Sequence, residues 1–302
     1  MTARQEHAAG DVPLVRLESD HLAVDVAPSI GGRIVNLTHK PSAHQFLWHN
    51  PRLRLARAEP GNTYDPNFYG GIDEIIPVDI PETVDGIGYP DHGELWPTPL
   101  GHRFDGQTLV LEGLLPLSGL RYRREMRLDR DGPAVHLNYA ITNTSGASRA
   151  FLWKLHAALA IEPGDRIDCP AGRAVAADVA WARGKTAEPF DWPEVNGQRA
   201  DMIPQPDGTT DFLFLYELRE GRVGWRSGDG RRRVEIRFDP RVFPYVCYFA
   251  SYGGLDGHVV AVLEPCTAMP LLVMEAQRLG QCSVLASGQV LSTDMTITAD
   301  AV

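Results

Sequence analysis

One short segment of the sequence concentrates side chains that can exchange protons or bind a ligand. Residues 88–96 place His92 beside Asp91 and close to Glu94, and glycine and proline bound the stretch. Turns that gather such groups often carry function. The alternative is a polar surface turn in which both carboxylates face water, and this segment by itself favours neither interpretation.

A second histidine lies in an alternating segment in the middle of the chain. If residues 151–157 form a strand, Lys154 and His156 share one face of it, because successive side chains of a strand point to opposite faces. A lone histidine on a strand is more often a structural residue than a catalyst. His156 therefore gains weight only in combination with other groups.

A carboxylate ends the apolar run of residues 259–264. Glu264 follows four aliphatic residues and an alanine and is followed by Pro265. A carboxylate is seldom buried without a partner or a task, and a histidine or another cation would be a suitable partner. The alternative is a glutamate that emerges at the rim of a sheet.

The elements that must position these groups are predicted to be β-strands. Helical periodicity is scarce, whereas alternation with a period of two recurs. Residues 120–128 and 135–142 alternate on both sides of Asp131-Gly132-Pro133, which predicts an antiparallel hairpin. Further strands are expected at residues 22–27, 33–38, 108–111, 150–161, 233–238, 245–251, 259–264 and 295–299.

The organisation of the chain favours one all-β domain. Residues 172–208 show no sustained period and are expected to cross one face as a long excursion that contributes to a site rim. No internal repeat or linker divides the sequence. We expect a single domain over residues 1–302, with its core at about 20–300, built from stacked antiparallel sheets.

Composition excludes several classes of partner. The 39 acidic and 29 basic residues give a formal charge of -10, which disfavours nucleic acid and anionic membrane surfaces. The N-terminal run lacks the apolar core of a signal peptide, and no stretch approaches the roughly 18 apolar residues of a membrane span, so a cytoplasmic protein is expected. The four scattered cysteines are expected to be free thiols, mostly buried.

Taken in order, the three segments resemble the galactose mutarotase-like family, also called aldose 1-epimerases. In that family a sugar-binding histidine lies in a His-Gly loop in the first third of the chain, which His92 matches. A second histidine follows a strand that ends in Thr-Asn, as His156 follows residues 142–144. The family's base is a glutamate that closes an apolar strand just before a proline, as Glu264 does. The resemblance extends from about residue 22 to residue 299.

The resemblance implies a fold, an activity and roles for these residues. The fold is a large antiparallel β-supersandwich. The activity is that of a mutarotase, which interconverts the α and β anomers of a free aldose by opening and closing the ring. Glu264 would act as base and His156 as acid, with His92 assisting at the ring oxygen, and neither a metal nor another cofactor is required. The setting of His156 in Trp-Lys-Leu-His departs from the family's pattern and leaves the identity of the sugar open.

Sugar recognition calls for an aromatic platform and polar groups that hold hydroxyls. Trp96 is the candidate platform, although ordinary core packing explains this residue equally well. Asp73, Glu74 and Lys154 are the candidate hydroxyl-binding groups. No arginine cluster lies near the three segments, which favours a neutral aldose over a phosphosugar.

Three other interpretations remain open. In the first, the chain shares the fold and only binds carbohydrate, as a non-catalytic or regulatory protein. Asp91, His92 and Glu94 could ligate a metal, although the sequence lacks H-x-H and H-E-x-x-H spacing. Asp91 and Glu264 could also form the carboxylate pair of a glycoside hydrolase.

Overall fold

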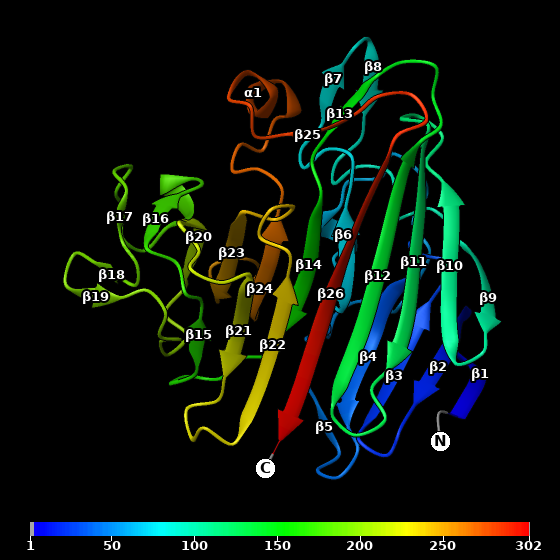
Figure 1. The fold of residues 1–302 in the computed structure, drawn as a ribbon. Coiled ribbons are helices and arrows are strands. Elements are labelled where there is room, and N and C mark those ends of the chain that lie inside the picture. Colours follow the sequence, from blue (N-terminus) through cyan, green and yellow to red (C-terminus); the bar gives the residue numbers. More distant parts are fainter. Residues whose placement is uncertain (1–2, 302) are drawn as a thin grey trace.

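Two large antiparallel sheets face each other in the computed structural model, which describes residues 3–301 (Figure 1). The first sheet has twelve strands, in the spatial order β1-β2-β3-β4-β6-β14-β24-β23-β20-β16-β17 with β5 paired to β4. The second has eight, in the order β15-β21-β22-β26-β12-β11-β10-β9. The expectation of an all-β supersandwich is confirmed.

The strand bounds of the two sheets are as follows. The first sheet contains β1 (Ala3–Ala9), β2 (Val12–Glu18), β3 (Leu22–Ala27), β4 (Arg33–His39), β5 (His44–Gln45), β6 (Ile72–Ile75), β14 (Lys154–Leu159), β16 (Arg173–Ala176), β17 (Phe190–Asp191), β20 (Thr209–Tyr216), β23 (Tyr245–Tyr252) and β24 (Val259–Cys266). The second contains β9 (Gly101–Asp105), β10 (Thr108–Leu114), β11 (Leu120–Leu128), β12 (Ala134–Asn143), β15 (Arg166–Asp168), β21 (Arg222–Arg226), β22 (Arg232–Phe238) and β26 (Val290–Ala301).

Smaller elements surround these sheets. Two-stranded pairs join β7 (Glu82–Val84) to β8 (Ile87–Tyr89), β13 (Arg149–Phe151) to β25 (Ser283–Leu285), and β18 (Glu194–Val195) to β19 (Gln198–Arg199). The short helices are η1 (Asp65–Asn67), η2 (Val179–Trp181) and α1 (Val273–Arg278). No helix within residues 3–301 has both the length and the hydropathy needed to cross a membrane.

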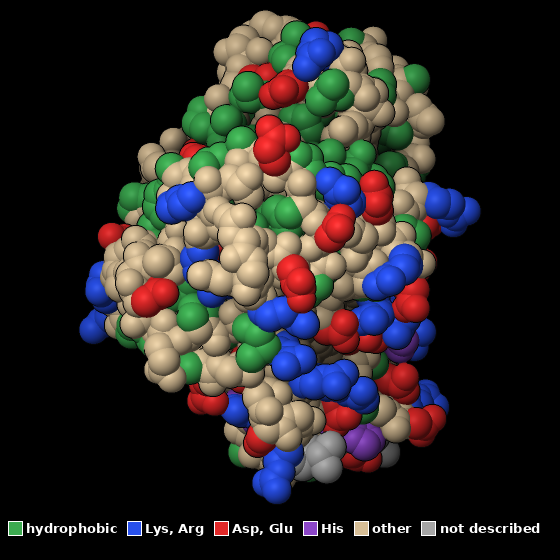
Figure 2. All heavy atoms as spheres, turned by 90° about the vertical axis from the view of Figure 1, so that its left-hand side faces the viewer, with side chains coloured by type: hydrophobic (Ala, Val, Ile, Leu, Met, Phe, Trp, Pro, Cys, Tyr) green, Lys and Arg blue, Asp and Glu red, His purple; other side chains and the backbone are tan. Residues whose placement is uncertain are grey.

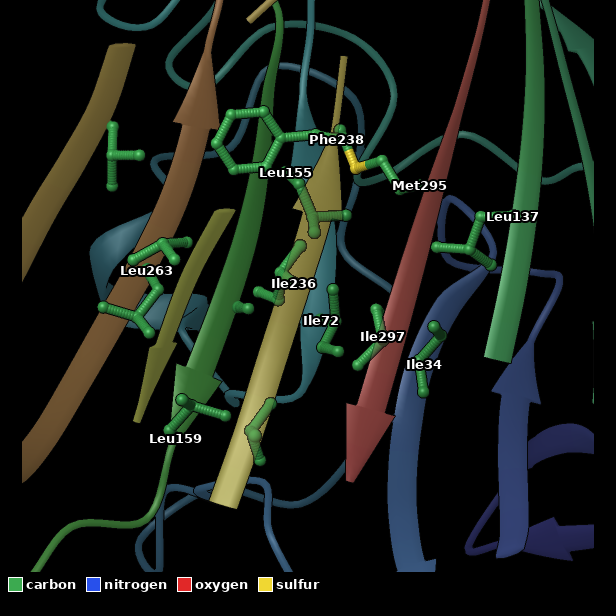
Figure 3. Close-up of a cluster of buried hydrophobic side chains, with 14 of the residues drawn as sticks. Ile34, Ile72, Leu137, Leu155, Leu159, Ile236, Phe238, Leu263, Met295 and Ile297 are labelled. Atoms are coloured by element: carbon green, nitrogen blue, oxygen red, sulfur yellow. The ribbon is translucent and has the colours of Figure 1, made fainter. Parts of the chain in front are cut away.

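The main core lies between the two sheets (Figure 3). Ile72, Leu155 and Leu263 project from the first sheet toward Ile236 and Ile297 of the second. Each such buried aliphatic side chain contributes about 1.5–3 kcal/mol of transfer free energy. Because side chains alternate along a strand, burying these residues fixes the direction of their neighbours, which point to the other face of the first sheet.

The predicted hairpin is confirmed. β11 and β12 pair antiparallel from Leu120↔Asn143 to Leu128↔Val135, and β11 alternates between buried and more exposed residues. The predicted strands at residues 22–27, 33–38, 233–238, 245–251 and 259–264 also form, each with its ends within two residues of the prediction.

The prediction of one continuous strand over residues 150–161 is wrong. The segment divides into β13 and β14, which belong to different sheets. At the division, the amide of Leu152 donates to the carbonyl of Pro77, and the amide of Trp153 donates to Oγ1 of Thr267. These tertiary hydrogen bonds replace a sheet ladder, and their partners are remote in sequence, so local alternation did not reveal the division.

Residues 172–208 form an excursion beside β20, as expected. They contain β16, η2 and the strands β17 to β19, which project from one end of the first sheet (Figure 1). Figure 2 looks onto this side of the molecule, where hydrophobic side chains gather in the upper half and charged side chains crowd the lower half. Asp178 and Trp181 of the excursion line the cavity described below.

Candidate active site

A cavity of about 290 Å³ opens on the face of the first sheet that points away from the second sheet. His156 and Glu264 line it from the neighbouring strands β14 and β24, and His92 lines it from a loop. The three side chains proposed to transfer protons thus meet at one cavity, although His92 and Glu264 are 172 positions apart in the sequence. The cavity volume lies just below the range of roughly 300–1,000 Å³ that is usual for small-molecule sites.

Strand alternation explains why β14 supplies two polar groups. Leu155 and Ala157 are buried in the core between the sheets, so Lys154 and His156 must point to the other face. The same rule applies on β24, where Leu263 enters the core and Glu264 lines the cavity. The sequence prediction that Lys154 and His156 share a face is confirmed.

His156 is held by a carboxylate on the adjacent strand. Its Nδ1 lies 3.0 Å from Oδ1 of Asp73, the residue opposite it in the β6–β14 pairing. Because Nδ1 is committed to Asp73, Nε2 is the ring nitrogen left to face the cavity. Asp73 therefore acts on His156 and is not itself a cavity-lining residue, which corrects the prediction that Asp73 contacts a sugar hydroxyl.

Two more side chains complete the environment of Asp73. The hydroxyl of Tyr64 donates to its Oδ2 at 2.8 Å, and Nη2 of Arg33 lies 2.5 Å from the same oxygen. Burial by itself would raise the pKa of Asp73, but the charge of Arg33 and the hydrogen bonds from His156 and Tyr64 lower it to about 2. A carboxylate that stays ionised in this way remains the hydrogen-bond partner of Nδ1 of His156 and fixes the orientation of the imidazole.

The loop that carries His92 is strained and closely packed. His92 has a φ of 56° and is followed by Gly93 with a φ of 73°. A Cβ atom at Gly93 would lie 2.1 Å from the carbonyl oxygen of Ile76, so only glycine fits there. This close approach places the His-Gly pair against the segment that follows β6.

The orientation of His92 is fixed by Asp91 and Tyr64. Nδ1 of His92 lies 2.9 Å from Oδ1 of Asp91, and the imidazole stacks on the ring of Tyr64 with 4.0 Å between centroids. Burial would lower the pKa of His92, but the hydrogen bond to Asp91 and the charges of Asp79, Asp91 and Asp65 raise it. The centroids of the His92 and His156 rings are 6.2 Å apart.

Glu264 is buried with a cation beside it. Its side chain is 5% exposed, and its Oε2 lies 3.5 Å from Nζ of Lys154. Lys154 also forms an ion pair with Asp79 and lies 5.6 Å from the centroid of the Phe214 ring. One ammonium group thus pairs with two buried carboxylates. The expectation that a buried Glu264 would have a cationic partner is confirmed, but that partner is a lysine and not a histidine.

Lys154 remains charged in this setting. Burial would lower the pKa of Lys154, but the negative charges around it, chiefly that of Asp79, raise its pKa well above the usual value. An ammonium group held between two carboxylates orients Glu264 and balances its charge. Lys154 lines the cavity, so contact with a ligand hydroxyl is compatible with this role.

Two predicted binding residues lie away from the cavity. Glu74 points into the core between the sheets, where its carboxylate accepts hydrogen bonds from Tyr122, Arg124 and Trp153. Its neighbour Asp73 points the other way because the residues of β6 alternate. The prediction that Glu74 holds a sugar hydroxyl is therefore corrected to a structural role.

Trp96 packs against two residues that position His92, namely Asp91 and Tyr64. Its Nε1 donates to the carbonyl of Asp91 at 3.1 Å, and its ring meets that of Tyr64 edge-on. Trp96 is buried and does not line the cavity, so the core-packing interpretation replaces that of a sugar platform. The exposed aromatic residue at the cavity is instead Trp181.

The cavity wall combines apolar and acidic side chains. Its carbon-rich lining residues include Phe68, Ile80, Phe212, Phe249 and Leu271. Among the described residues, its carboxylates are Asp65, Asp79, Asp178 and Glu264, and Lys154 is the one Lys or Arg that lines it. This charge balance opposes an anionic ligand and is compatible with a neutral one.

The geometry also bears on the metal interpretation. The carboxylate of Glu94 accepts hydrogen bonds from the amides of Leu117 and Ser118, whereas that of Asp91 is bonded to His92 and to the amide of Tyr64. Within residues 3–301, no group of three or more His, Cys, Asp or Glu side chains is arranged to hold a metal ion.

Sequence reasoning missed Arg33, Tyr64, Asp79 and Trp181. Arg33 directly follows two glycines, and Asp79 stands among prolines and aliphatic residues; neither position has a local pattern that marks a site. The one available signal was the unperiodic excursion that contains Trp181. Arg33, Tyr64 and Asp79 reach the site through contacts between segments that are remote in sequence. The periodicity of the sequence does not reveal such contacts.

Comparison with solved structures identifies proteins that share this fold. A galactose mutarotase-like protein from Clostridium acetobutylicum superposes with a TM-score of 0.73 at 12% identity, over 100% of this chain and 99% of that one. A provisionally assigned aldose 1-epimerase from Klebsiella pneumoniae gives 0.74 at 16% identity, over 96% of this chain and 80% of that one. A galactose mutarotase related enzyme from Lactobacillus acidophilus gives 0.67 at 13% identity, over 95% and 97%. The chain thus has the galactose mutarotase-like fold, as the sequence resemblance implied.

Sequence comparison adds no further assignment, because no family model and no curated protein matches the chain.

Proposed function

We propose that this protein is an aldose 1-epimerase that interconverts the anomers of a neutral aldose. The observation that carries the proposal is the convergence of Glu264, His156 and His92 on one cavity of monosaccharide size. The shared fold supports it, although a fold by itself does not fix an activity.

Ring opening requires two proton transfers in opposite directions. Glu264 removes the proton from the C1 hydroxyl as the C1–O5 bond breaks, and protonated His156 delivers a proton to O5 through Nε2. The C1 carbonyl then rotates, and the reverse transfers close the ring from its other face. Each well-placed proton transfer contributes about 10²- to 10⁴-fold in rate.

The surrounding residues fit these roles. Asp73 orients the imidazole of His156 through Nδ1. The raised pKa of His92 favours its protonated form, which can donate a hydrogen bond to O5. Lys154 holds Glu264 in place. The apolar part of the wall lowers the local polarity around the reacting groups, which strengthens their electrostatic interactions.

Anomer exchange tests the proposal directly. Purified protein is added to freshly dissolved α-glucose and α-galactose, and the approach to anomeric equilibrium is followed by polarimetry and by exchange NMR over a panel of aldoses. We expect acceleration above the buffer rate for at least one neutral aldose. If several aldoses bind and none equilibrates faster, the enzymatic assignment is wrong.

A non-catalytic carbohydrate-binding protein is the second candidate. The observation that favours it is the contact between Glu264 and Lys154, since the carboxylate already has an ionic partner that a C1 hydroxyl would have to share. Sugar binding without faster anomer exchange would select this candidate.

A further inference from the structure

A second cavity adjoins the candidate active site. It has a volume of about 520 Å³ and shares Trp181 with the first cavity. The turn after β23 also connects them, because Gly254 lines the second cavity and Leu255 lines the first. The two hollows therefore meet along one indole ring and one turn.

Hydrogen bonds hold the backbone at Trp181 in place, although the residue is exposed. Its carbonyl accepts a hydrogen bond from Oγ1 of Thr210 at 2.9 Å. Both backbone groups of the preceding residue, Ala180, are hydrogen-bonded: its amide donates to Asp178, and its carbonyl accepts from Lys185. These bonds fix the backbone that carries Trp181, and its ring lies 6.3 Å from that of Phe249 between centroids. With 37% of Trp181 exposed, the structure presents an aromatic surface at the junction of two cavities. Such a surface suits stacking on the apolar face of a sugar ring.

The charges around the second cavity are largely balanced within the protein. Arg183 is paired with Asp211 at 2.6 Å and lies over the ring of Tyr252. Nζ of Lys185 is engaged by a backbone carbonyl, and the carboxylate of Asp207 accepts from the amide and hydroxyl of Thr209. A polar lining with internally paired charges fits a neutral ligand rich in hydroxyl groups better than an anion.

We propose that the second cavity is a subsite for the next sugar of a disaccharide or longer saccharide whose reducing-end ring occupies the active-site cavity. Trp181 is the platform that the two rings share. This inference rests on the proposed function and specifies its substrate class: a reducing saccharide that is glycosylated away from C1, so that its C1 hydroxyl remains free for Glu264.

The test compares disaccharides with their reducing-end monosaccharide. Anomer exchange of maltose, cellobiose and glucose is measured by NMR with the wild type and with Trp181→Ala. We expect at least one disaccharide to exceed glucose by about tenfold in kcat/KM, equivalent to about 1.4 kcal/mol of added binding in the transition state. Trp181→Ala should remove most of that preference, whereas Trp181→Phe should keep much of it.

A second variant tests the subsite independently, in case Trp181→Ala fails to fold. Gln198 is exposed and lines only the second cavity, so Gln198→Ala should lower the preference for the disaccharide without unfolding the protein. Unfolding temperatures of all variants are measured in parallel. A preference that is equal in the wild type, Trp181→Ala and Gln198→Ala would overturn the subsite.

The remaining outcomes separate the two proposals. If glucose and both disaccharides exchange with equal kcat/KM, the subsite proposal is wrong and the epimerase assignment stands. If calorimetry shows a higher affinity for maltose than for glucose and neither sugar exchanges faster than in buffer, the epimerase assignment is wrong and the subsite is supported. If glucose 6-phosphate is preferred to every neutral sugar and Lys185→Ala removes that preference, the second cavity binds an anion and the inference is wrong.

Discussion

The imidazole of His156 and the carboxylate of Asp73 face each other across neighbouring strands, with 3.0 Å between Nδ1 and Oδ1. This contact decides which nitrogen of His156 is available to a ligand. Because the two residues are directly opposite in the β6–β14 register, a shift of one strand by a single residue would separate them. The sheet therefore sets both the orientation and the charge environment of the proposed acid.

Replacing the proposed base should abolish exchange with little effect on binding. Glu264→Gln keeps the shape of the side chain but removes its capacity to accept the C1 proton, so we expect a loss of about 10²- to 10⁴-fold in kcat with sugar affinity changed little. Exchange NMR and calorimetry measure the two quantities. Glu275→Gln, on the exposed side of α1, is the matched control and should behave as the wild type.

The two cavity histidines should contribute unequally. His156→Ala removes the proposed proton donor to O5 and should lose most of the rate, whereas His92→Ala should lose less, because His156 can still protonate the ring oxygen. His136→Ala on the second sheet is the control. Equal activity of His156→Ala and the wild type on an accelerated sugar would show that the acid has been misassigned.

Asp73 should affect both activity and acid stability. Asp73→Asn removes the carboxylate that orients the imidazole of His156, so kcat should fall by about 10²-fold or more. The pKa of Asp73 is about 2 in the folded protein and about 3.9 when unfolded, so its stabilisation is present above pH 4 and is lost as the pH falls through 2.

Unfolding measured from pH 6 to pH 2 checks this linkage. The gap in stability between the wild type and Asp73→Asn should narrow as the pH decreases over that window. A gap that stays constant with pH would contradict the lowered pKa of Asp73.

Lys154 should be needed for stability as well as for positioning. Lys154→Met leaves Asp79 and Glu264 buried without their shared cation, and breaking a buried ion pair in this way costs about 3–5 kcal/mol. Chemical denaturation measures the loss. The double variant Lys154→Met with Asp79→Asn removes one of the two uncompensated charges and should recover part of the stability, whereas no recovery would argue against charge as the cause.

Strand alternation and segment order were sufficient to predict much of the fold. The β11–β12 hairpin and the shared face of Lys154 and His156 follow from a period of two, because successive side chains of a strand point to opposite faces. β24 was instead predictable as a short continuous apolar run, and it is buried along nearly its whole length. The side chains that now line the cavity were identifiable by type: two histidines and a carboxylate placed in a turn or on strands.

The environment of those side chains was not predictable in the same way. Glu74 and Trp96 have residue types suited to sugar binding, and only their burial against Tyr122 and Tyr64 shows that they serve the core. Lys154 gave no local sign that it would hold Glu264. Each of these outcomes depends on which distant segment packs nearby.

The amino-acid sequence alone determined the all-β architecture and the chemical groups available for proton transfer, since both are encoded in local pattern and residue type. The tertiary structure alone decided that Asp73, Tyr64 and Arg33 support His156, and that Trp181 stands at the cavity. The physical reason is that a hydrogen bond or an ion pair depends on distances of about 3 Å between atoms, and strand pairing across the sheet sets those distances for residues that lie far apart along the chain.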